Sequence, residues 1–214
     1  MIPINPESEP LRHCLRDPIP EIAEAARYLD AAVSANNAGR FASAEELIAA
    51  ANISAIRQWT ESLWGKNSPY VKVRSVAAPQ INSIAAARKR HPDASLRALL
   101  HGRDGYNCRF CDIPVIRAEI RRRMNKQYPQ SAVWGKHNAA CHAAFQAMWA
   151  QYDHVVPFTL GGDTHIDNLI VTCAPCNFGR MEHSLEAVGL ADPRARAPVK
   201  TSWDGLERFR SKAV

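Results

Sequence analysis

Apolar residues recur at helical spacing through the first third of the chain. The stretch "PEIAEAARYLDAAVSAN" begins at Pro20, and proline is favoured in a first helical turn. Ile22, Ala25, Leu29 and Val33 fall on one face of this predicted helix, which should end near the "NNAG" that follows. The pattern predicts a long amphipathic helix with a single buried face.

Two shorter helices are predicted next. In "SAEELIAAAN", Ser43 followed by Glu46 has the spacing of a capping box, in which the two side chains close the helix start. In "SAIRQWTESLWG", Trp59 and Leu63 lie on one face and Gly65 ends the helix. Apolar stripes of this kind mark packing faces, and no set of catalytic residue types occurs in the first hundred residues.

The basic run at 88–90 and the "HPD" after it predict a boundary, because proline disfavours helix at the residue before it. A helix in "DASLRALLHGRD" should follow, capped by Asp93 or Ser95. We divide the chain into an irregular leader at 1–18, an N-terminal helical region at 19–93, a second domain at 94–190 with a helical insertion at about 113–150, and a C-terminal tail at 191–214.

Two helices are expected inside the insertion, in "PVIRAEIRRRMNKQ" and "NAACHAAFQAMWAQY". The first has a strongly basic face with Glu119 as its single acid. Such a basic run usually forms a solvent-exposed face, and the more specific interpretation is that it contacts phosphates. The candidate contacts to nucleic acid on this helix are Arg117, Arg121, Arg122 and Lys126.

Composition narrows the class of protein. The 214 residues are 46% hydrophobic and 22% charged, which is ordinary for a soluble globular chain. The net charge of +6 is compatible with a polyanionic partner without requiring one. The N-terminus lacks the basic start and apolar run of a signal peptide, and no stretch approaches the roughly 18 apolar residues of a membrane span. We therefore expect a cytoplasmic protein without a membrane partner.

Four of the six cysteines form two pairs with two residues between the members: Cys108 and Cys111, then Cys173 and Cys176. Two such turns close a tetrahedral four-sulfur shell around zinc, and a closed shell indicates a structural ion. A redox-active dithiol needs one pair in a βαβ context, which is missing here. Cys14 and Cys141 are expected to act as small apolar residues, with Cys141 inside a helix.

The segment around the second cysteine pair has a pattern of apolar and polar residues that differs from the helical spacing of the N-terminal region. "YDHVVPF" and "NLIVT" are β-prone runs separated by the turn-forming "LGGD", and "NFGRMEHSLEAVGL" has helical spacing up to Gly189. The expected unit is strand, loop, strand and helix, with the thiols at its base. Asp153 and His154 lie in the first of these strands.

These residues resemble the HNH endonucleases, which have the ββα-metal fold. The resemblance covers about 101–182 and rests on "DHVVP", "GG", "NL", "CxxCN" and "GR", read in that order from Asp153. The spacings from His154 to Asn168 and on to Asn177 are similar to those in the HNH module of RNA-guided DNA nucleases, which lack the cysteines. The insertion is longer than in compact members. The fold class expected is α+β, mostly helical, with this core, a structural zinc site made of four cysteines and an N-terminal helical region.

The resemblance implies a metal-dependent endonuclease that hydrolyses phosphodiester bonds, with double-stranded DNA as the partner. His154 would be the general base, and Asp153 and Asn177 would hold one Mg-type or other divalent ion. Asn168 would fix the loop that bears His154 through backbone hydrogen bonds, and Arg180 would contact the scissile phosphate.

Two other interpretations stay open on the sequence. A non-catalytic zinc module could bind nucleic acid or bridge proteins with its thiols and basic helix alone, although it has no need of Asp153, His154 and Asn177 at their spacing. An HNH variant that cuts RNA is also compatible, because such a site contacts phosphate more than base. The sequence carries no dimer signature and does not indicate a target.

Overall fold

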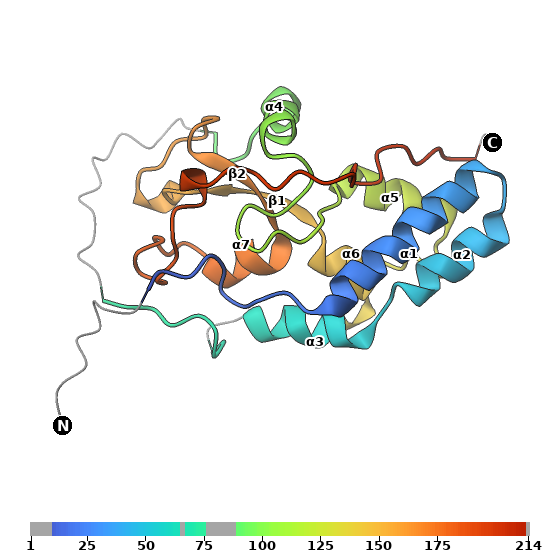
Figure 1. The fold of residues 1–214 in the computed structure, drawn as a ribbon, viewed down its shortest axis with the longest axis horizontal. Helices are drawn as coiled ribbons and strands as arrows, with labels where there is room; N and C mark the ends of the chain where they lie inside the picture. The colour runs from blue at the N-terminus through green and yellow to red at the C-terminus, as the bar shows by residue number, and fades with distance from the viewer. Residues whose placement is uncertain (1–9, 65–66, 76–88, 213–214) are drawn as a thin grey trace.

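The computed structural model describes residues 10–64, 67–75 and 89–212 (Figure 1). Within them the fold is α+β and mostly helical, as predicted. Two strands form one antiparallel sheet, in which Ala150 pairs with Cys173 and His154 with Leu169. The elements are α1 (Pro20–Asn37), α2 (Phe41–Ala50), α3 (Ser54–Leu63), α4 (Ala94–Asp104), α5 (Ala118–Gln127), α6 (Ala143–Ala147), β1 (Ala150–His154), β2 (Leu169–Cys173) and α7 (Ala174–Arg180).

The N-terminal helices follow the apolar pattern, with one error. α1 starts at Pro20 and α3 at Ser54, as predicted, whereas Gly65 lies outside the described residues. The capping box at Ser43 is wrong, because α2 begins at Phe41 with Arg40 before it. Gly39, at φ +77°, turns the chain sharply after α1, so the next helix starts before Ser43 is reached.

The start of α4 agrees with one of the two predicted caps. The Asp93 carboxylate accepts a hydrogen bond of 2.9 Å from the Leu96 amide, and the Ser95 hydroxyl donates to the same carboxylate at 2.7 Å. Asp93 is therefore the cap, and Ser95 supports it.

The insertion contains less helix than predicted. α5 is present, but α6 is only 5 residues long, and residues 150–152 belong to β1 instead of a helix. His142 caps α6, and the Ala150 amide donates to the Ile116 carbonyl at 2.9 Å. Cys141 therefore has extended backbone, with φ −98° and ψ 148°, and its predicted helical position is wrong.

α7 begins earlier and ends earlier than its periodicity suggests. Cys173 precedes it and accepts a hydrogen bond from the Cys176 amide, with Pro175 in the first turn. The helix stops at Arg180 because Met181 takes a left-handed φ of 55°, so the predicted continuation to Gly189 is wrong. The stretch after Met181 forms turns.

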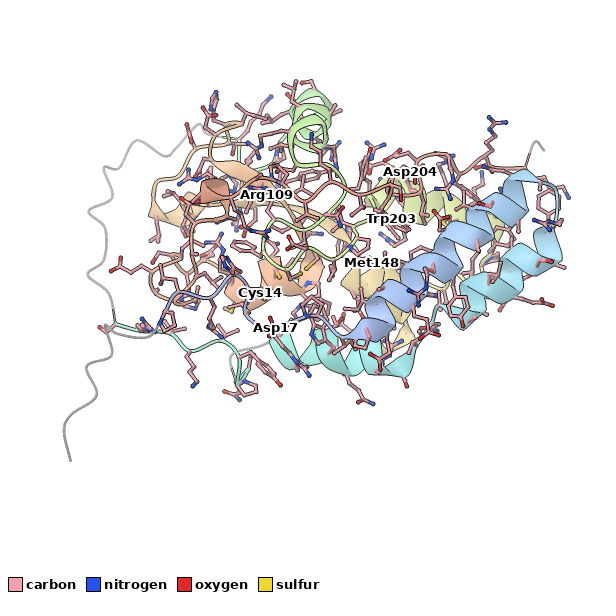
Figure 2. The ribbon with its side chains drawn as sticks, viewed as in Figure 1. Cys14, Asp17, Arg109, Met148, Trp203 and Asp204 are labelled. Atoms are coloured by element: carbon pink, nitrogen blue, oxygen red, sulfur yellow. The ribbon has the colours of Figure 1, made fainter. Side chains whose placement is uncertain are left out.

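One continuous cluster of buried apolar side chains runs from the N-terminal helices to the C-terminal segment. α3 contacts both α6 and α7, so the N-terminal helices buttress the strand–strand–helix unit. The C-terminal segment crosses to α1 (Figure 1), where Arg208 pairs with Asp30 at 2.6 Å. Trp203 lies on this segment and is labelled in Figure 2. Its indole nitrogen donates to the Val115 carbonyl at 3.0 Å. The domain boundaries stay predictions. No helix of the described residues has the length and apolar character needed to cross a membrane.

Candidate active site and metal centre

The four paired cysteines meet in the interior. Cys173 ends β2, Cys176 lies in the first turn of α7, and Cys108 and Cys111 come from the turn before the insertion. All four are buried, and their sulfur atoms lie within 4.8 Å of one another. A tetrahedral zinc ion with Zn–S bonds of about 2.3 Å would space its sulfurs by about 3.8 Å. The cluster therefore fits the predicted four-sulfur zinc site.

The pKa values of the four thiols also favour a bound cation in the cluster. Hydrogen bonds with the other three thiols raise the pKa of Cys176 well above its usual value. Burial raises the pKa of Cys108, but hydrogen bonds from the other thiols outweigh it and lower that pKa well below its usual value. A dry cluster thus favours a single thiolate, and a bound divalent cation would stabilise all four.

A buried acid that the sequence did not single out ties the cysteine turn and α4 to the sheet. Asp104 is 1% exposed and accepts from the Val171 amide at 2.9 Å. Arg103 pairs with Asp104 at 2.8 Å and donates to the Leu169 carbonyl at 2.6 Å. The Arg109 amide donates to the Val171 carbonyl at 2.8 Å, which holds the first cysteine turn against β2.

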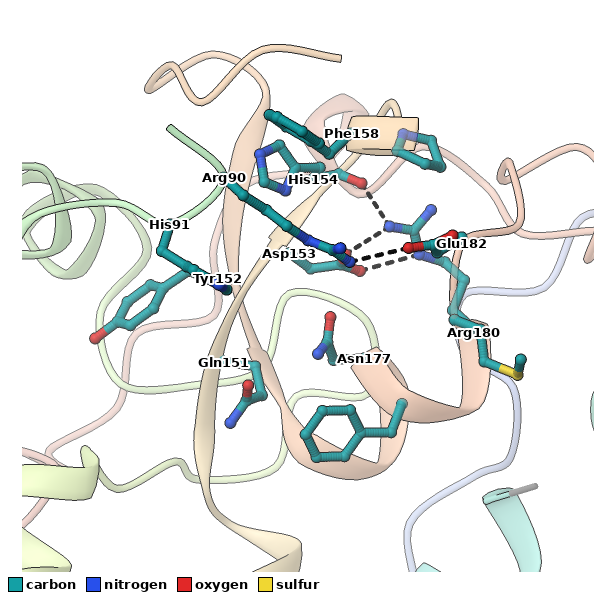
Figure 3. Close-up of a pocket in the computed structure, with 13 residues that line it drawn as sticks. Arg90, His91, Gln151, Tyr152, Asp153, His154, Phe158, Asn177, Arg180 and Glu182 are labelled. Carbon is teal, nitrogen blue, oxygen red and sulfur yellow. Dashed lines mark hydrogen bonds and ion pairs between the residues drawn. The ribbon is translucent and has the colours of Figure 1, made fainter. Parts of the chain in front are cut away.

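An open pocket of about 350 Å³ lies between the end of β1 and α7 (Figure 3). Asp153 and His154 reach it from β1, and Asn177 and Arg180 reach it from α7. The antiparallel register places Asp153 opposite Ile170, so β2 connects the pocket to the cysteine cluster at its other end. Three of the four predicted catalytic residues thus line one pocket.

Asn168, the fourth, is not among the residues that line the pocket, and it binds the loop that follows β1. Its side-chain oxygen accepts from the Val156 amide at 2.9 Å. Its nitrogen donates to the Val156 carbonyl at 3.1 Å and to the Asp163 carbonyl at 2.9 Å. Gly162 packs so tightly here that a Cβ atom would meet the Val156 carbonyl oxygen at 1.8 Å, which explains why glycine is needed. Asn168 therefore binds the loop that follows β1, and its role in the reaction stays a prediction.

The hydrogen bonds of His154 define its tautomer. Nε2 lies 3.0 Å from Thr164 Oγ1, and this hydroxyl donates its proton to the Lys89 carbonyl at 2.5 Å. Thr164 must therefore accept from His154, which puts the proton on Nε2 and leaves a lone pair on Nδ1, with no hydrogen bond to it among the described residues. Burial, followed by the charges of Arg90 and Arg180, lowers the pKa of His154 to about 4. The ring is neutral at pH 7, as a general base must be.

Asp153 and Arg180 form a buried bidentate ion pair. The two bonds measure 2.6 and 2.9 Å, and Arg180 also donates to the His154 carbonyl at 2.5 Å. Arg180 is 1% exposed, so it does not have the position expected of a phosphate contact and instead holds the acid. Burial raises the pKa of Asp153, and the charge of Arg180 opposes that rise.

Oxygen atoms suited to a hard cation remain in the pocket. Each carboxylate oxygen of Asp153 has a lone pair beyond the one that Arg180 uses. Asn177 is half-buried and lines the same pocket (Figure 3), and its side-chain amide has no hydrogen bond among the described residues. Asp153 and Asn177 therefore fit a Mg-type ion by donor type and placement.

An ion pair from outside the strand–strand–helix unit crosses the pocket. Arg90 binds Glu182 at 2.9 Å, and both side chains are about half exposed (Figure 3). The sequence offered Arg90 only as part of a basic boundary run, because its approach to Glu182 depends on how distant segments pack. An exposed pair of this kind is weak and can open for a substrate.

The basic face predicted on α5 is largely absent. Arg121 is 7% exposed and lies over the Trp134 ring at 3.4 Å, and Arg117 pairs with Glu207 at 2.5 Å. Arg122 and Lys126 are exposed, so they alone among the predicted contacts on this helix remain available to a phosphate. The expectation of a strongly positive outer face is wrong, because most of its charges stabilise the interior or the C-terminal segment.

Comparison with known proteins gives one match. Residues 140–183 match the family model described as HNH endonuclease. Neither the curated proteins nor the solved structures yielded a match. The matched range includes β1, β2, α7 and one of the two cysteine pairs. The segment that carries Asp153, His154 and Asn177 therefore matches the HNH endonuclease family model.

Proposed function

We propose that the protein is a metal-dependent endonuclease that hydrolyses phosphodiester bonds in DNA. The observation that supports this most is the neutral His154, which lines a pocket with Asp153 and Asn177 and whose Nδ1 has no hydrogen bond to any described residue. A base and two hard oxygen ligands at one site suit attack by water on a phosphodiester. The match of this segment to a nuclease family supports the same reaction class.

In the proposed reaction His154 accepts a proton from the attacking water at Nδ1. Thr164 keeps the ring in the required tautomer, and Asn168 keeps the loop around it in place. Asp153 and Asn177 would hold a Mg-type ion, which when bound would offset charge on the phosphate and assist the leaving oxygen. Arg180 is buried and orients Asp153 through their bidentate ion pair.

We also propose that the cysteine cluster holds a structural zinc ion, separate from this chemistry. Four sulfur ligands close a tetrahedral shell, so no position remains for water or substrate. Soft sulfur favours zinc and hard oxygen favours magnesium, so the two ions would not compete for the same atoms.

The non-catalytic zinc module draws less support. It would rely on the basic face of α5, where Arg121 instead stacks on Trp134 and Arg117 forms an ion pair with Glu207. It also gives no reason for a neutral, oriented histidine in a pocket. Salt-sensitive binding without cleavage is the result that would favour it.

The test is cleavage of supercoiled plasmid by wild type and His154→Ala, each without divalent ion and with Mg or Mn. Circular dichroism and zinc content first establish that both proteins are folded. We expect nicking or linearisation by the wild type only, and only with added ion. If folded, zinc-loaded wild type cuts neither DNA nor a matched RNA, the result contradicts the proposal. If it cuts the RNA alone, the substrate is RNA and not DNA.

A further inference from the structure

A cation over the proposed active site has unused hydrogen-bond donors. Arg90 lines the same pocket as His154 and Asn177 (Figure 3), and its side chain is 55% exposed. Its guanidinium makes one hydrogen bond to a described residue, from Nη2 to the Glu182 carboxylate at 2.9 Å. An arginine has several further N–H groups, and those of Arg90 have no partner among the described residues. Arg90 can therefore donate to a ligand that enters this pocket.

The other arginine in the pocket is buried and bound to other groups. Arg180 is 1% exposed, and it donates to the Asp153 carboxylate and to the backbone carbonyls of His154 and His183. No lysine is among the described residues that line the pocket. Within this part of the chain, Arg90 is thus the residue whose positive charge and free donors face an anionic substrate.

The backbone on both sides of Arg90 is held by other contacts. On one side the Lys89 carbonyl accepts from Thr164 Oγ1 at 2.5 Å, and Thr164 also accepts from His154. On the other side Pro92 is buried. Arg90 is therefore fixed beside the loop that orients the proposed base. After burial, its charge is the next largest cause that lowers the pKa of His154, which agrees with this proximity.

The bond between Arg90 and Glu182 is weak and can be exchanged. Both side chains are about half exposed, so water competes for each of them and the pair stabilises the fold little. A tether between two segments is the ordinary role of such a pair, but the segment of Arg90 is already held by Thr164. A phosphate that enters the pocket offers the guanidinium oxygens for a bidentate contact, and Glu182 can turn into water.

We propose that Arg90 contacts the phosphate that is cut, and that Glu182 holds this arginine until the substrate displaces it. Contact with a phosphate in the pocket follows from the free donors of Arg90, whereas the identity of this phosphate as the one that is cut rests on the proposed nuclease function. A guanidinium at the phosphate oxygens stabilises the charge that develops there in the transition state. Arg90 thus takes the role that the sequence suggested for Arg180.

The test is that the two members of the ion pair have opposite effects. Arg90→Ala should slow single-turnover nicking of supercoiled plasmid about tenfold or more under identical Mg, because a positive charge at the phosphate is lost. Glu182→Gln removes the competing charge at similar volume and should nick at least as fast as wild type. Equal slowing by both variants would mean that the pair only tethers the chain, and it would overturn the proposal.

Binding gives a second measurement that does not depend on cleavage. Affinity for a short DNA duplex is measured by fluorescence anisotropy, with His154→Ala as the parent and Mg held constant. Adding Arg90→Ala should weaken binding about tenfold, and adding Glu182→Gln should strengthen it severalfold. Both differences should shrink as KCl is raised, because salt screens contacts with phosphate.

Arg27→Ala is the matched control. Arg27 is exposed on α1 and does not line the pocket, so its loss changes the net charge equally without touching the site. This variant should keep the cleavage rate of wild type and the affinity of the parent. Urea midpoints close to that of the parent should show that all three variants fold, since the substituted side chains are exposed.

The two proposals fail separately. If wild type cuts plasmid and Arg90→Ala matches Arg27→Ala in both cleavage and binding, the phosphate contact is overturned and the nuclease function stands. If no plasmid is cut, but Arg90→Ala weakens binding and Glu182→Gln strengthens it, Arg90 binds phosphate and the nuclease function alone is lost.

Discussion

The tautomer of His154 depends on a single hydroxyl. Thr164 Oγ1 accepts from Nε2 at 3.0 Å because its own proton is donated to the Lys89 carbonyl. Without that acceptor the ring can place its proton on Nδ1 or rotate, and either change removes the lone pair from the pocket. Thr164 is thus a positioning residue for the proposed base.

Thr164→Val, which keeps the shape and removes the hydroxyl, should lower the nicking rate about tenfold or more without loss of zinc. Thr164→Ser restores the hydroxyl and should recover most of the rate. The measurement is single-turnover nicking under identical Mg. Equal impairment of both variants would show that the methyl group, and not the hydrogen bond, is what matters at this position.

The ion pair between Asp153 and Arg180 makes a prediction about stability. Both side chains are buried, so Arg180→Leu would leave an unpaired carboxylate in the interior. The expected loss in free energy of unfolding is about 3–5 kcal/mol, measured by urea titration. Arg122→Leu, at an exposed position, is the control and should stay within about 0.5 kcal/mol of wild type. The double variant with Asp153→Asn should recover part of the loss, and failure to do so would exclude this pair as its cause.

At the scale of single residues, the sequence identified which residues meet but not how they pair. Spacing along the chain was enough to group Asp153, His154 and Asn177, since two short strands and a helix leave few ways to arrange them. The partners of these residues could not be predicted. Arg180 binds Asp153 only because α7 packs on β1, and Thr164 reaches Lys89 across a gap of many residues.

Among the elements, the cysteine cluster joins pieces that would otherwise be separate. It connects the turn before the insertion to the end of β2 and the start of α7, and the sheet has two strands within the described part of the chain. A pair of short strands has little stability of its own in water. The strand–strand–helix unit should therefore depend on metal for its order.

Cys176→Ser should lose the bound zinc, measured by metal content, together with a cooperative thermal transition. Cys141→Ser is the matched control, because Cys141 is also buried but lies outside the cluster and donates to backbone carbonyls that serine can reach. We expect this control to keep its zinc and nearly all of its stability. A zinc-free Cys176→Ser protein with an unchanged transition would show that the fold does not rely on the metal.

Element boundaries were predictable where local signals decide them and failed where tertiary contacts do. Pro20 and Asp93 set the starts of α1 and α4 through backbone and capping preferences that act locally. α6 is short because residues 149–150 are taken up by pairing with Ile116, and no periodicity reveals such a bridge. α7 starts early because a cysteine of the cluster caps it.

At the scale of the whole molecule, the N-terminal helices and the segment that matches the HNH family model share one core. His142 illustrates the connection: its Nε2 donates to the Ile48 carbonyl of α2 at 2.8 Å, and its Nδ1 accepts from the Phe145 amide at the start of α6. The side chain is fully buried. Because one nitrogen donates and the other accepts, only the neutral ring satisfies both partners.

Acid should therefore weaken the junction between these helices. Burial is the main cause that lowers the pKa of His142 to about 4, from 6.5 in the unfolded chain. Between those values the unfolded state binds more protons, so the stability that His142 contributes is present above pH 6.5 and falls as the pH drops toward 4. The loss between pH 7 and pH 5 should be about 2 kcal/mol. Other groups titrate in this range, so the useful quantity is the difference between wild type and His142→Gln, which cannot take up the proton. Urea unfolding should show that the difference in free energy of unfolding between wild type and His142→Gln shrinks by about that amount from pH 7 to pH 5. A difference that is independent of pH would mean that His142 is protonated in the folded protein or exposed to water.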